Sequence, residues 1–445
     1  MASLREIART IFERALADCN VGEALARHVR TRNRHLYLDG EEFDTEKLEH
    51  IRIVAAGKAA NGMLQAVSRE LAALPRCDIA GVLIAPEPPT ALPEGFAVFA
   101  GGHPFPTQAS FDGAGAALDL LGALPETSSD KALCIFLVSG GASAMMELPL
   151  DPAISLADTV EFHRALVGCG ASITEINCVR KHFSAVKGGR LALAARGAIC
   201  RSFFISDVPA GHEDALGSGP TVPDSSTMTD CREILARYDL LGQFPASVRR
   251  FFQSTALPET PKSAQLQAKT VLVLGPNDLA RAAARHAQEL GFTPVIDDTC
   301  NDWEYRRSAQ YLLDRLRVLR REHSRACLIS VGEAAVELPT QFAASIGIGG
   351  RNQQFALYAA TLLRREDGQT AVLSAGSDGV DGNSPAAGAV VDQSTLGADS
   401  FPQTRDDAND ALGKFDAFPF LQNRNATIVT GPSGNNLRDL RIFLA

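Results

Sequence analysis

The chain has 445 residues, more than the ~100–150 residues of a typical domain, so two or three domains are expected. Its 43 Lys and Arg residues against 52 Asp and Glu residues give a formal net charge of −9, which argues against a nucleic-acid coat or a polybasic membrane anchor. Hydrophobic residues make up 45% and charged residues 21% of the chain, a globular composition that argues against disorder.

The first predicted element is an amphipathic helix. Apolar residues recur at helical spacing between Leu4 and Leu16 with charged residues between them, which is not the pattern of an export signal. The longest charge-free apolar stretch, residues 132–146, is shorter than the ~20 residues that span a bilayer, so no membrane partner is expected. The nine cysteines are scattered without a CxxC pair, which favours reduced thiols in a cytoplasmic protein over a zinc site.

Short apolar runs then alternate with longer helical stretches along the chain. Because these runs are apolar throughout, they predict strands covered on both faces, as in a parallel sheet flanked by helices. The predicted strands are residues 51–56, 79–85, 133–138, 203–205, 271–274, 327–331, 371–374 and 426–430.

A domain boundary is predicted in the polar stretch 253–269, which contains Pro258 and Pro261. The alternation of strands and helices restarts after it. The fold class is therefore α/β with two domains, 1–260 and 261–445, each a largely parallel sheet flanked by helices.

Nearly every predicted strand is followed by small or acidic residues. In open parallel sheets, ligands bind beyond the carboxyl ends of the strands. Glycines there allow backbone N–H groups to approach an anion, and the following helix N-termini favour negative charge. For any single glycine a chain turn is the better explanation, but the whole set, with Lys, Arg and Asp at the same edges, favours an anion site.

Two of these loops lie in the first domain. Lys58 follows the first strand within VAAGKAAN, where its ammonium suits a phosphate or carboxylate, although a solvated lysine is the alternative. The loop LVSGGASA offers the hydroxyls of Ser139 and Ser143 and close backbone approach at Gly140 and Gly141. It is neither a Walker P-loop nor a nucleophile elbow, and a structural turn is the alternative.

A basic segment and an aspartate follow in the same domain. At helical spacing Asn177, Arg180 and Lys181 share a face, with Lys187 shortly after, so the segment is suited to a polyphosphate unless it is a solvated basic helix. Asp207 stands at the end of a buried strand, where a carboxylate can act as a general base or hold a metal-bound water.

The second domain carries the remaining candidates. Arg351 and Asn352 follow a glycine loop, and the guanidinium of Arg351 suits bidentate binding of a phosphate. Glu333 follows another strand. Asp378 and Asp381, three residues apart in a turn-rich loop, are candidate ligands of Mg²⁺, unless they only cap turns.

Taken in order, several segments resemble the glycerate 2-kinase family, whose C-terminal half is the MOFRL domain. The matching segments are VAAGKAANGM, GGHPFPTQAS, VSGGASAMMELP, INCVRKHFSAVKGGRLA, ISDVPAGHEDALGSGPTVPD, GIGGRNQQFAL, SAGSDGVDGNSPAAGAVVD and TGPSGNNLRDL. The resemblance implies ATP-dependent phosphorylation of the 2-hydroxyl of D-glycerate with Mg²⁺. It also implies a Rossmann-like glycerate kinase domain at 1–260, a MOFRL domain at 261–445, and a site in the cleft between them.

The resemblance assigns the family's lysine to Lys58 and its arginine to Arg351, where both would neutralise charge on the migrating phosphoryl group. The family's third loop glycine is Ala142 here, which makes this loop stiffer. Asp207 is the candidate for the group near the attacking hydroxyl. The partners implied are D-glycerate and a nucleotide, with the chain a monomer or homodimer.

Two other functions stay open. Some members of the family have been labelled hydroxypyruvate reductases, but no GxGxxG dinucleotide fingerprint is present in this chain. A non-catalytic metabolite-binding protein is the other alternative, against which the retained Lys58, Arg351 and Asp378 argue.

Overall fold

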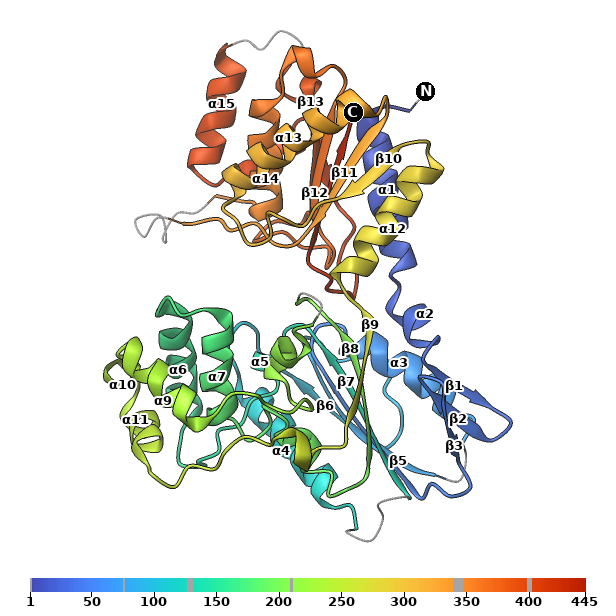
Figure 1. Cartoon of the computed structure of the whole chain (residues 1–445), viewed down its shortest axis with the longest axis vertical. Helices are drawn as coiled ribbons and strands as arrows, with labels where there is room; N and C mark the ends of the chain where they lie inside the picture. Colours follow the sequence, from blue (N-terminus) through green and yellow to red (C-terminus); the bar gives the residue numbers. More distant parts are fainter. Residues whose placement is uncertain (1, 75–76, 126–130, 209–210, 339–346, 398–401) are drawn as a thin grey trace. The chain divides into compact units, whose positions relative to one another are not determined.

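The computed structural model describes residues 2–74, 77–125, 131–208, 211–338, 347–397 and 402–445. The chain divides into two compact units (Figure 1). One comprises residues 21–274, and the other joins residues 1–20 to residues 275–445. Each unit is built on one six-stranded sheet.

The sheet of unit 21–274 is parallel throughout, in the order β6-β5-β4-β7-β8-β9. Its central strand β7 is buried at every position, as its unbroken apolar run predicts. The strands are β4 (His50–Ala56), β5 (Asp78–Ala85), β6 (Phe96–Ala100), β7 (Ala132–Ser139), β8 (Ile199–Ile205) and β9 (Lys269–Leu274). A separate antiparallel sheet consists of β1 (Val29–Arg32), β2 (His35–Leu38) and β3 (Glu41–Asp44).

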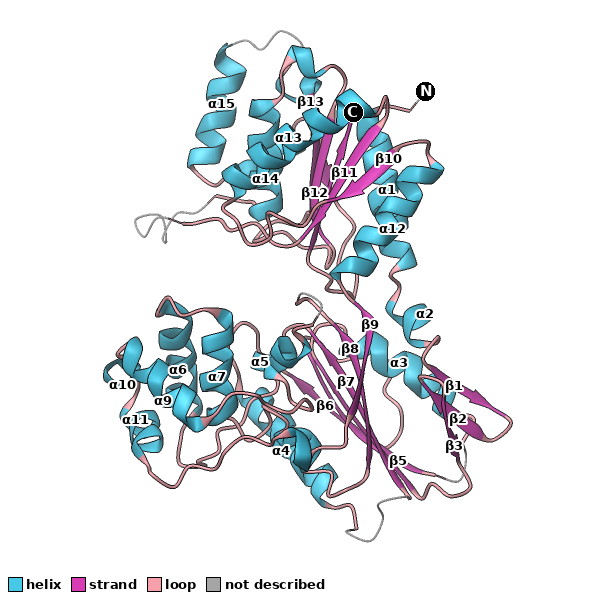
Figure 2. Cartoon of the chain, in the orientation of Figure 1, coloured by secondary structure: helices cyan, strands magenta, loops and turns pink. Residues whose placement is uncertain are grey.

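Helices cover this parallel sheet and extend beyond it (Figure 2). A helical subdomain surrounds stacked and edge-to-face phenylalanines, among them Phe162, Phe183 and Phe252. The helices of the unit are α2 (Val21–Leu25), α3 (Ala60–Leu71), α4 (Gln108–Gly122), α5 (Ala142–Met145), α6 (Leu156–Gly168), α7 (Ile173–Phe183), α8 (Arg190–Leu193), α9 (Met228–Arg237), α10 (Leu240–Gln243) and α11 (Ala246–Gln253), with 3₁₀ turns η1 (Glu213–Ser218) and η2 (Ser263–Gln265).

The second unit has a mixed sheet in the order β10-β11-β15-β12-β13-β14. Only the β10–β11 pair is parallel among its described strand pairs, because β13 and β15 run against their neighbours. The predicted α/β class is confirmed, but this sheet is mixed where a largely parallel one was expected. Its strands are β10 (Thr293–Ile296), β11 (Ala326–Val331), β12 (Ala371–Gly376), β13 (Gly388–Asp392), β14 (Thr427–Ile428) and β15 (Asp439–Leu444).

Helices cover both faces of the mixed sheet (Figure 2). α1 (Leu4–Asp18) and α12 (Pro276–Glu289) pack together on one face, and α13 (Tyr305–Glu322) and α14 (Arg351–Leu362) pack on the other. The unit also contains α15 (Pro402–Gly413), α16 (Ala417–Gln422), η4 (Arg365–Asp367) and η5 (Gln393–Leu396).

The units differ from the predicted ranges 1–260 and 261–445 in two places. β9 pairs in parallel with β8, so it completes the first sheet instead of opening the second. The predicted N-terminal helix is α1, and its buried apolar face, which includes Ile11 and Phe12, packs in the unit formed mainly by the C-terminal residues. In the described residues, no helix is both long and apolar enough to cross a membrane.

Candidate functional site

The loops after β4 and β7 are tied together at the carboxyl edge of the parallel sheet. The backbone N–H of Lys58 donates to the carbonyl of Gly140 at 2.9 Å, and the N–H of Ala59 donates to Ser139 Oγ at 3.0 Å. Ser139 is fully buried and Lys58 is half-buried. The hydroxyl of Ser139 is thus engaged in fixing the lysine loop.

Gly141, in the loop after β7, packs beside the side chains of Lys58 and His103. It has φ +85°, a left-handed conformation that favours glycine. A Cβ atom on Gly141 would lie 3.3 Å from His103 Cδ2 and 3.4 Å from Lys58 Cγ. Glycine therefore lets this loop pack closely against Lys58, His103 and Met145, and a larger residue would crowd all three.

Ser143 and Asn177 are joined through a residue that the sequence did not single out. Ser218 is fully buried and donates to Asn177 Oδ1 at 2.9 Å. Because this bond uses the hydrogen of Ser218, Ser143 is the donor in the 2.8 Å contact between the two serine hydroxyls. The chain of bonds links α5 to α7 next to the Ser139–Gly141 loop.

The two lysines predicted to bind ligand are buried in ion pairs. Lys187 Nζ lies 2.6 Å from Glu147 Oε2, and the same oxygen lies 2.9 Å from His163 Nε2. Lys181 Nζ contacts Asp214 Oδ2 at 3.0 Å and Asp224 Oδ1 at 3.2 Å. These contacts give both lysines structural partners within the unit, and a ligand-binding role for them remains a prediction.

The buried charges of this unit compensate one another. Burial alone would raise the pKa of Glu147, but Lys187 and His163 lower it to about 2. Burial lowers the pKa of His163 below its usual value, so the ring is neutral at pH 7. The cluster is therefore one carboxylate neutralised by one ammonium, with the imidazole as a hydrogen-bond partner.

Arg180 lies on α7, and burial lowers its pKa. Its Nε is buried and has no hydrogen-bond partner among the described residues. An unpaired buried donor on a cation is the feature expected where an anion binds. Asp207 follows β8 and is half-buried, while Pro209 and Ala210 lie outside the described residues.

In the other unit, Arg351 begins α14 at the edge where β11 and β12 end. Its Nε and Nη2 bind both oxygens of Asp439, at 2.6 and 3.0 Å, and its Nη1 lies 2.9 Å from Glu333 Oε2. Burial opposes its charge, yet Asp439 and Glu333 raise the pKa of Arg351 above its usual value. The side chain is still 38% exposed, so its remaining N–H donors can reach a ligand.

Asp381 caps the N-terminus of α14. Its Oδ1 accepts from the backbone of Asn352 at 3.0 Å, and its Oδ2 accepts from the backbone of Gln353 at 2.8 Å and from its side chain at 3.0 Å. Burial raises the pKa of Asp381 to about 6 although these bonds lower it. The side chain of Asn352 is buried as well and accepts from Ser374 Oγ at 2.6 Å.

The predicted metal ligands therefore have different surroundings. Both oxygens of Asp381 accept N–H donors, which suits a helix cap better than a cation ligand. Asp378 is half-buried and accepts from the backbone of Val380 at 3.1 Å. Within the described ranges, no group of three or more His, Cys, Asp or Glu residues is placed to hold a metal ion.

Three residues at these edges were missed by the sequence reasoning: His103, Ser218 and Asp439. His103 stands in GGHPFP, one of the family-like segments, and partial burial with the nearby Lys58 lowers its pKa. Ser218 and Asp439 stand in other such segments. The sequence therefore marks the segments that contain them, but not the residues that they contact.

The fold is α/β, with glycine loops and basic side chains at the strand ends of both units. Residues 7–253 match the family described as a domain of unknown function, DUF4147, and residues 326–439 match the MOFRL family. The D-glycerate 2-kinase of Thermotoga maritima is 34% identical over 402 residues, which cover 89% of this chain and 91% of the relative.

A relative from Agrobacterium vitis carries the provisional name hydroxypyruvate reductase. It is 32% identical over 99% of this chain and 94% of its own length. The crystal structure of glycerate kinase from Thermotoga maritima superposes with a TM-score of 0.81 at 32% identity, covering 99% of each chain. The chain therefore belongs to the glycerate 2-kinase family, and it is an enzyme of the kinase class.

Proposed function

We propose that this protein transfers the γ-phosphoryl group of ATP to the 2-hydroxyl of D-glycerate and releases 2-phosphoglycerate. The observation that carries the proposal is the loop pair at the carboxyl edge of the parallel sheet, where the backbone of Lys58 is bound to Gly140 and Gly141 packs beside the Lys58 side chain. The 34% identity to the D-glycerate 2-kinase of Thermotoga maritima supports the choice of substrate.

The residues at this edge suit an anionic group. Gly141 packs closely beside the Lys58 side chain, and Arg180 Nε is a buried donor without a partner among the described residues. Lys58 adds a half-buried ammonium. We assign the nucleotide phosphates or the glycerate carboxylate to this loop, with Arg180 and Asn177 on the adjoining helix.

At the sheet edge that carries Arg351, few carboxylates among the described residues are available to bind Mg²⁺. In kinases this ion is usually held by one or two carboxylates, with substrate phosphates and waters completing its coordination. Asp378 fits that role better than Asp381, whose oxygens cap α14. We propose Asp378 as the protein ligand and Asp381 as the residue that positions the helix carrying Arg351.

Phosphoryl transfer depends mainly on the positioning of the reactants and on stabilisation of the charge of the transferring group. ATP would supply the phosphoryl group, and Asp378 would hold a Mg²⁺ ion whose charge would offset part of that of the phosphates. Asp207 accepts the proton of the 2-hydroxyl as the oxygen forms its bond to phosphorus and the bond to the ADP oxygen breaks. Lys58 and Arg351 stabilise the negative charge on the transferring group, the largest contribution expected from side chains in such a transition state.

A coupled assay tests this function directly. We expect ADP formation that requires D-glycerate, and a phosphorus NMR spectrum that identifies the product as the 2-phosphate. Glycerate-dependent ADP formation with a 3-phosphate product would overturn the proposed position of transfer. Consumption of NADH with hydroxypyruvate and no ADP formation would overturn the kinase reaction in favour of the reductase.

The cell compartment is a lesser part of the proposal. None of the nine cysteines forms a disulfide among the described residues, and seven of them are buried. A chain with this many cysteines outside disulfides is typical of a reducing compartment. We therefore propose a cytoplasmic location.

A further inference from the structure

Two adjoining cavities lie in the second unit at the edge of its sheet opposite to Arg351. They surround the segment 363–370, which joins the end of α14 to the start of β12, whereas Arg351 and Asp378 lie at the other ends of these elements. Their volumes are about 460 and about 670 Å³, within the range of small-molecule sites.

The lining of these cavities is rich in arginine. The first is lined by Leu313, Leu316, Arg317, Arg320, Arg321, Arg364, Glu366, Asp367, Thr370 and Ala445. The second shares Arg317 and Arg364 and adds Arg365 and Arg405, without an acidic lining residue. In a chain with a net charge of −9, this is a local reversal of sign.

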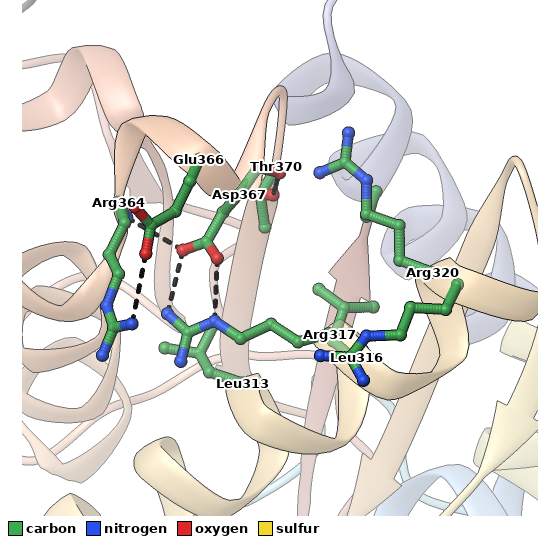
Figure 3. A pocket seen from close by; sticks show the side chains of 10 residues that line it. Leu313, Leu316, Arg317, Arg320, Arg364, Glu366, Asp367 and Thr370 are labelled. Atoms are coloured by element: carbon green, nitrogen blue, oxygen red, sulfur yellow. Dashed lines mark hydrogen bonds and ion pairs between the residues drawn. The ribbon is translucent and has the colours of Figure 1, made fainter.

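Two of these arginines are already paired within the lining. Arg317 binds Asp367 through Nε at 2.8 Å and Nη2 at 2.9 Å, and Arg364 Nη1 lies 3.3 Å from Glu366 Oε1 (Figure 3). The hydrogen bonds that Arg317 donates to Asp367 raise the pKa of Arg317 above its usual value. These two pairs form one wall of the first cavity and balance their own charges.

Arg320 and Arg321 supply the uncompensated charge. Both are exposed near the end of α13, and neither has an ion-pair or hydrogen-bond partner in the part of the chain that the structure describes. The Arg320 guanidinium lies against Gly368, where φ is +55° and an added Cβ would collide with it. The guanidinium therefore lies beside the backbone of the 363–370 segment, next to the cavity.

The chemistry of this lining favours phosphate. Guanidinium groups bind phosphate oxygens through paired N–H donors, a geometry that lysine does not offer. Two uncompensated guanidinium groups match the two negative charges of a phosphate better than the single charge of a carboxylate. Leu313 and Leu316 also line the cavity, as core side chains that are 1% and 3% exposed.

We propose that the cavity beside Arg320 and Arg321 binds a small molecule carrying a phosphate group. This site lies apart from the residues assigned to catalysis, and it does not depend on the proposed kinase reaction. Its lining residues Arg364 and Thr370 stand next to the end of α14 and the start of β12, and the opposite ends of these elements lie at or near Arg351 and Asp378.

Calorimetric titration with inorganic pyrophosphate tests the proposal on the full chain. We expect the variant Arg320→Ala/Arg321→Ala to bind at least about tenfold more weakly than the unchanged protein, the scale of losing charged hydrogen bonds. The matched control is Arg306→Ala/Arg307→Ala, which removes the same charge from the first turn of α13 and should bind normally. Arg320→Lys/Arg321→Lys should recover only part of the affinity.

Several results would overturn this site. One is normal binding by the Arg320→Ala/Arg321→Ala variant, and another is no pyrophosphate binding by the unchanged protein. Loss of binding in Arg351→Lys together with normal binding in Arg320→Ala/Arg321→Ala would move the anion to the catalytic edge. Malonate binding as tightly as pyrophosphate would replace phosphate with a dicarboxylate. Thermal melting of each variant verifies that it is folded.

Discussion

The two units each hold a buried carboxylate near their predicted sites, and the two groups behave oppositely. Glu147 is fully buried, yet Lys187 and His163 lower its pKa to about 2. Asp381 is 2% exposed, and burial raises its pKa to about 6. Glu147 has a directly bound counter-charge, whereas Asp381 accepts backbone and side-chain N–H groups at the start of α14 and is repelled by Asp439.

The contrast between Glu147 and Asp381 distinguishes charged groups that stabilise the fold from charged groups that orient a ligand-binding side chain. A buried ion pair such as Lys187–Glu147 fixes the fold, because neither partner can be removed without leaving the other unpaired. The Arg351–Asp439 pair stays partly exposed, so the arginine is oriented and still reaches solvent. Changes in the first cluster should therefore alter stability, and changes in the second should alter turnover.

The largest effect is expected for Lys187→Met, which leaves the Glu147 carboxylate buried without its ammonium. Unfolding free energy should fall by about 3–5 kcal/mol. Hydrogen exchange of the α7 amides measures it. The double variant Glu147→Gln/Lys187→Met should lose clearly less, and an equal loss in both would show that the charge pair is not the cause.

The variant Arg351→Lys should lower turnover by at least about 100-fold, the scale of one lost transition-state donor. It keeps a positive charge beside Asp439 but loses the bidentate fork. Glycerate-dependent ADP formation measures turnover, and Lys58→Ala should act on the same scale. Near-normal turnover in either variant would contradict the assigned role of that residue.

A smaller effect is expected for Asp381→Ala, which removes the acceptor for the first N–H groups of α14. A loss of about 2 kcal/mol in unfolding free energy is expected, at the upper end for a helix cap. Fluorescence of Trp303, the one tryptophan of the chain, reports on this unit during urea unfolding. Asp378→Ala is the matched control, and a loss as large in that variant would contradict a specific cap.

The smallest effect is a pH dependence of the same carboxyl group. The folded pKa of about 6 lies above the unfolded value near 3.9, so the native state binds the proton more tightly. Stability from this group therefore rises as pH falls from 7.5 to 5, by about 1 kcal/mol. Asp381→Asn should remove this rise in urea unfolding, and an unchanged rise would assign it to another group.

Much of the fold could be predicted because the parallel strands are unbroken apolar runs. β4, β5, β7 and β8 lie where such runs predicted them. β15 was missed because Asp439 and Arg441 interrupt its apolar pattern. Both are buried in the structure, with the Arg441 guanidinium over the ring of Phe355.

The candidate site was predictable to a lesser degree. Lys58 and Arg351 stand next to glycine loops, a local pattern that sequence displays directly. Lys187 also stands next to glycines, but its partner Glu147 lies 40 residues earlier in the chain. Only the folded chain brings this pair together, so spacing alone could not distinguish a structural lysine from a ligand-binding one.

The placement of α1 has a consequence for how the protein is made and divided. Arg5 and Arg9 donate to the backbone carbonyls of Asn425 and Thr427, more than 400 residues later. In sequence, the unit 21–274 is thus inserted within the other one. During synthesis, nearly the whole chain must be translated before α1 can pack against its partner residues. A fragment starting at residue 275 would expose an apolar groove, and adding back a peptide of residues 1–20 should rescue its solubility.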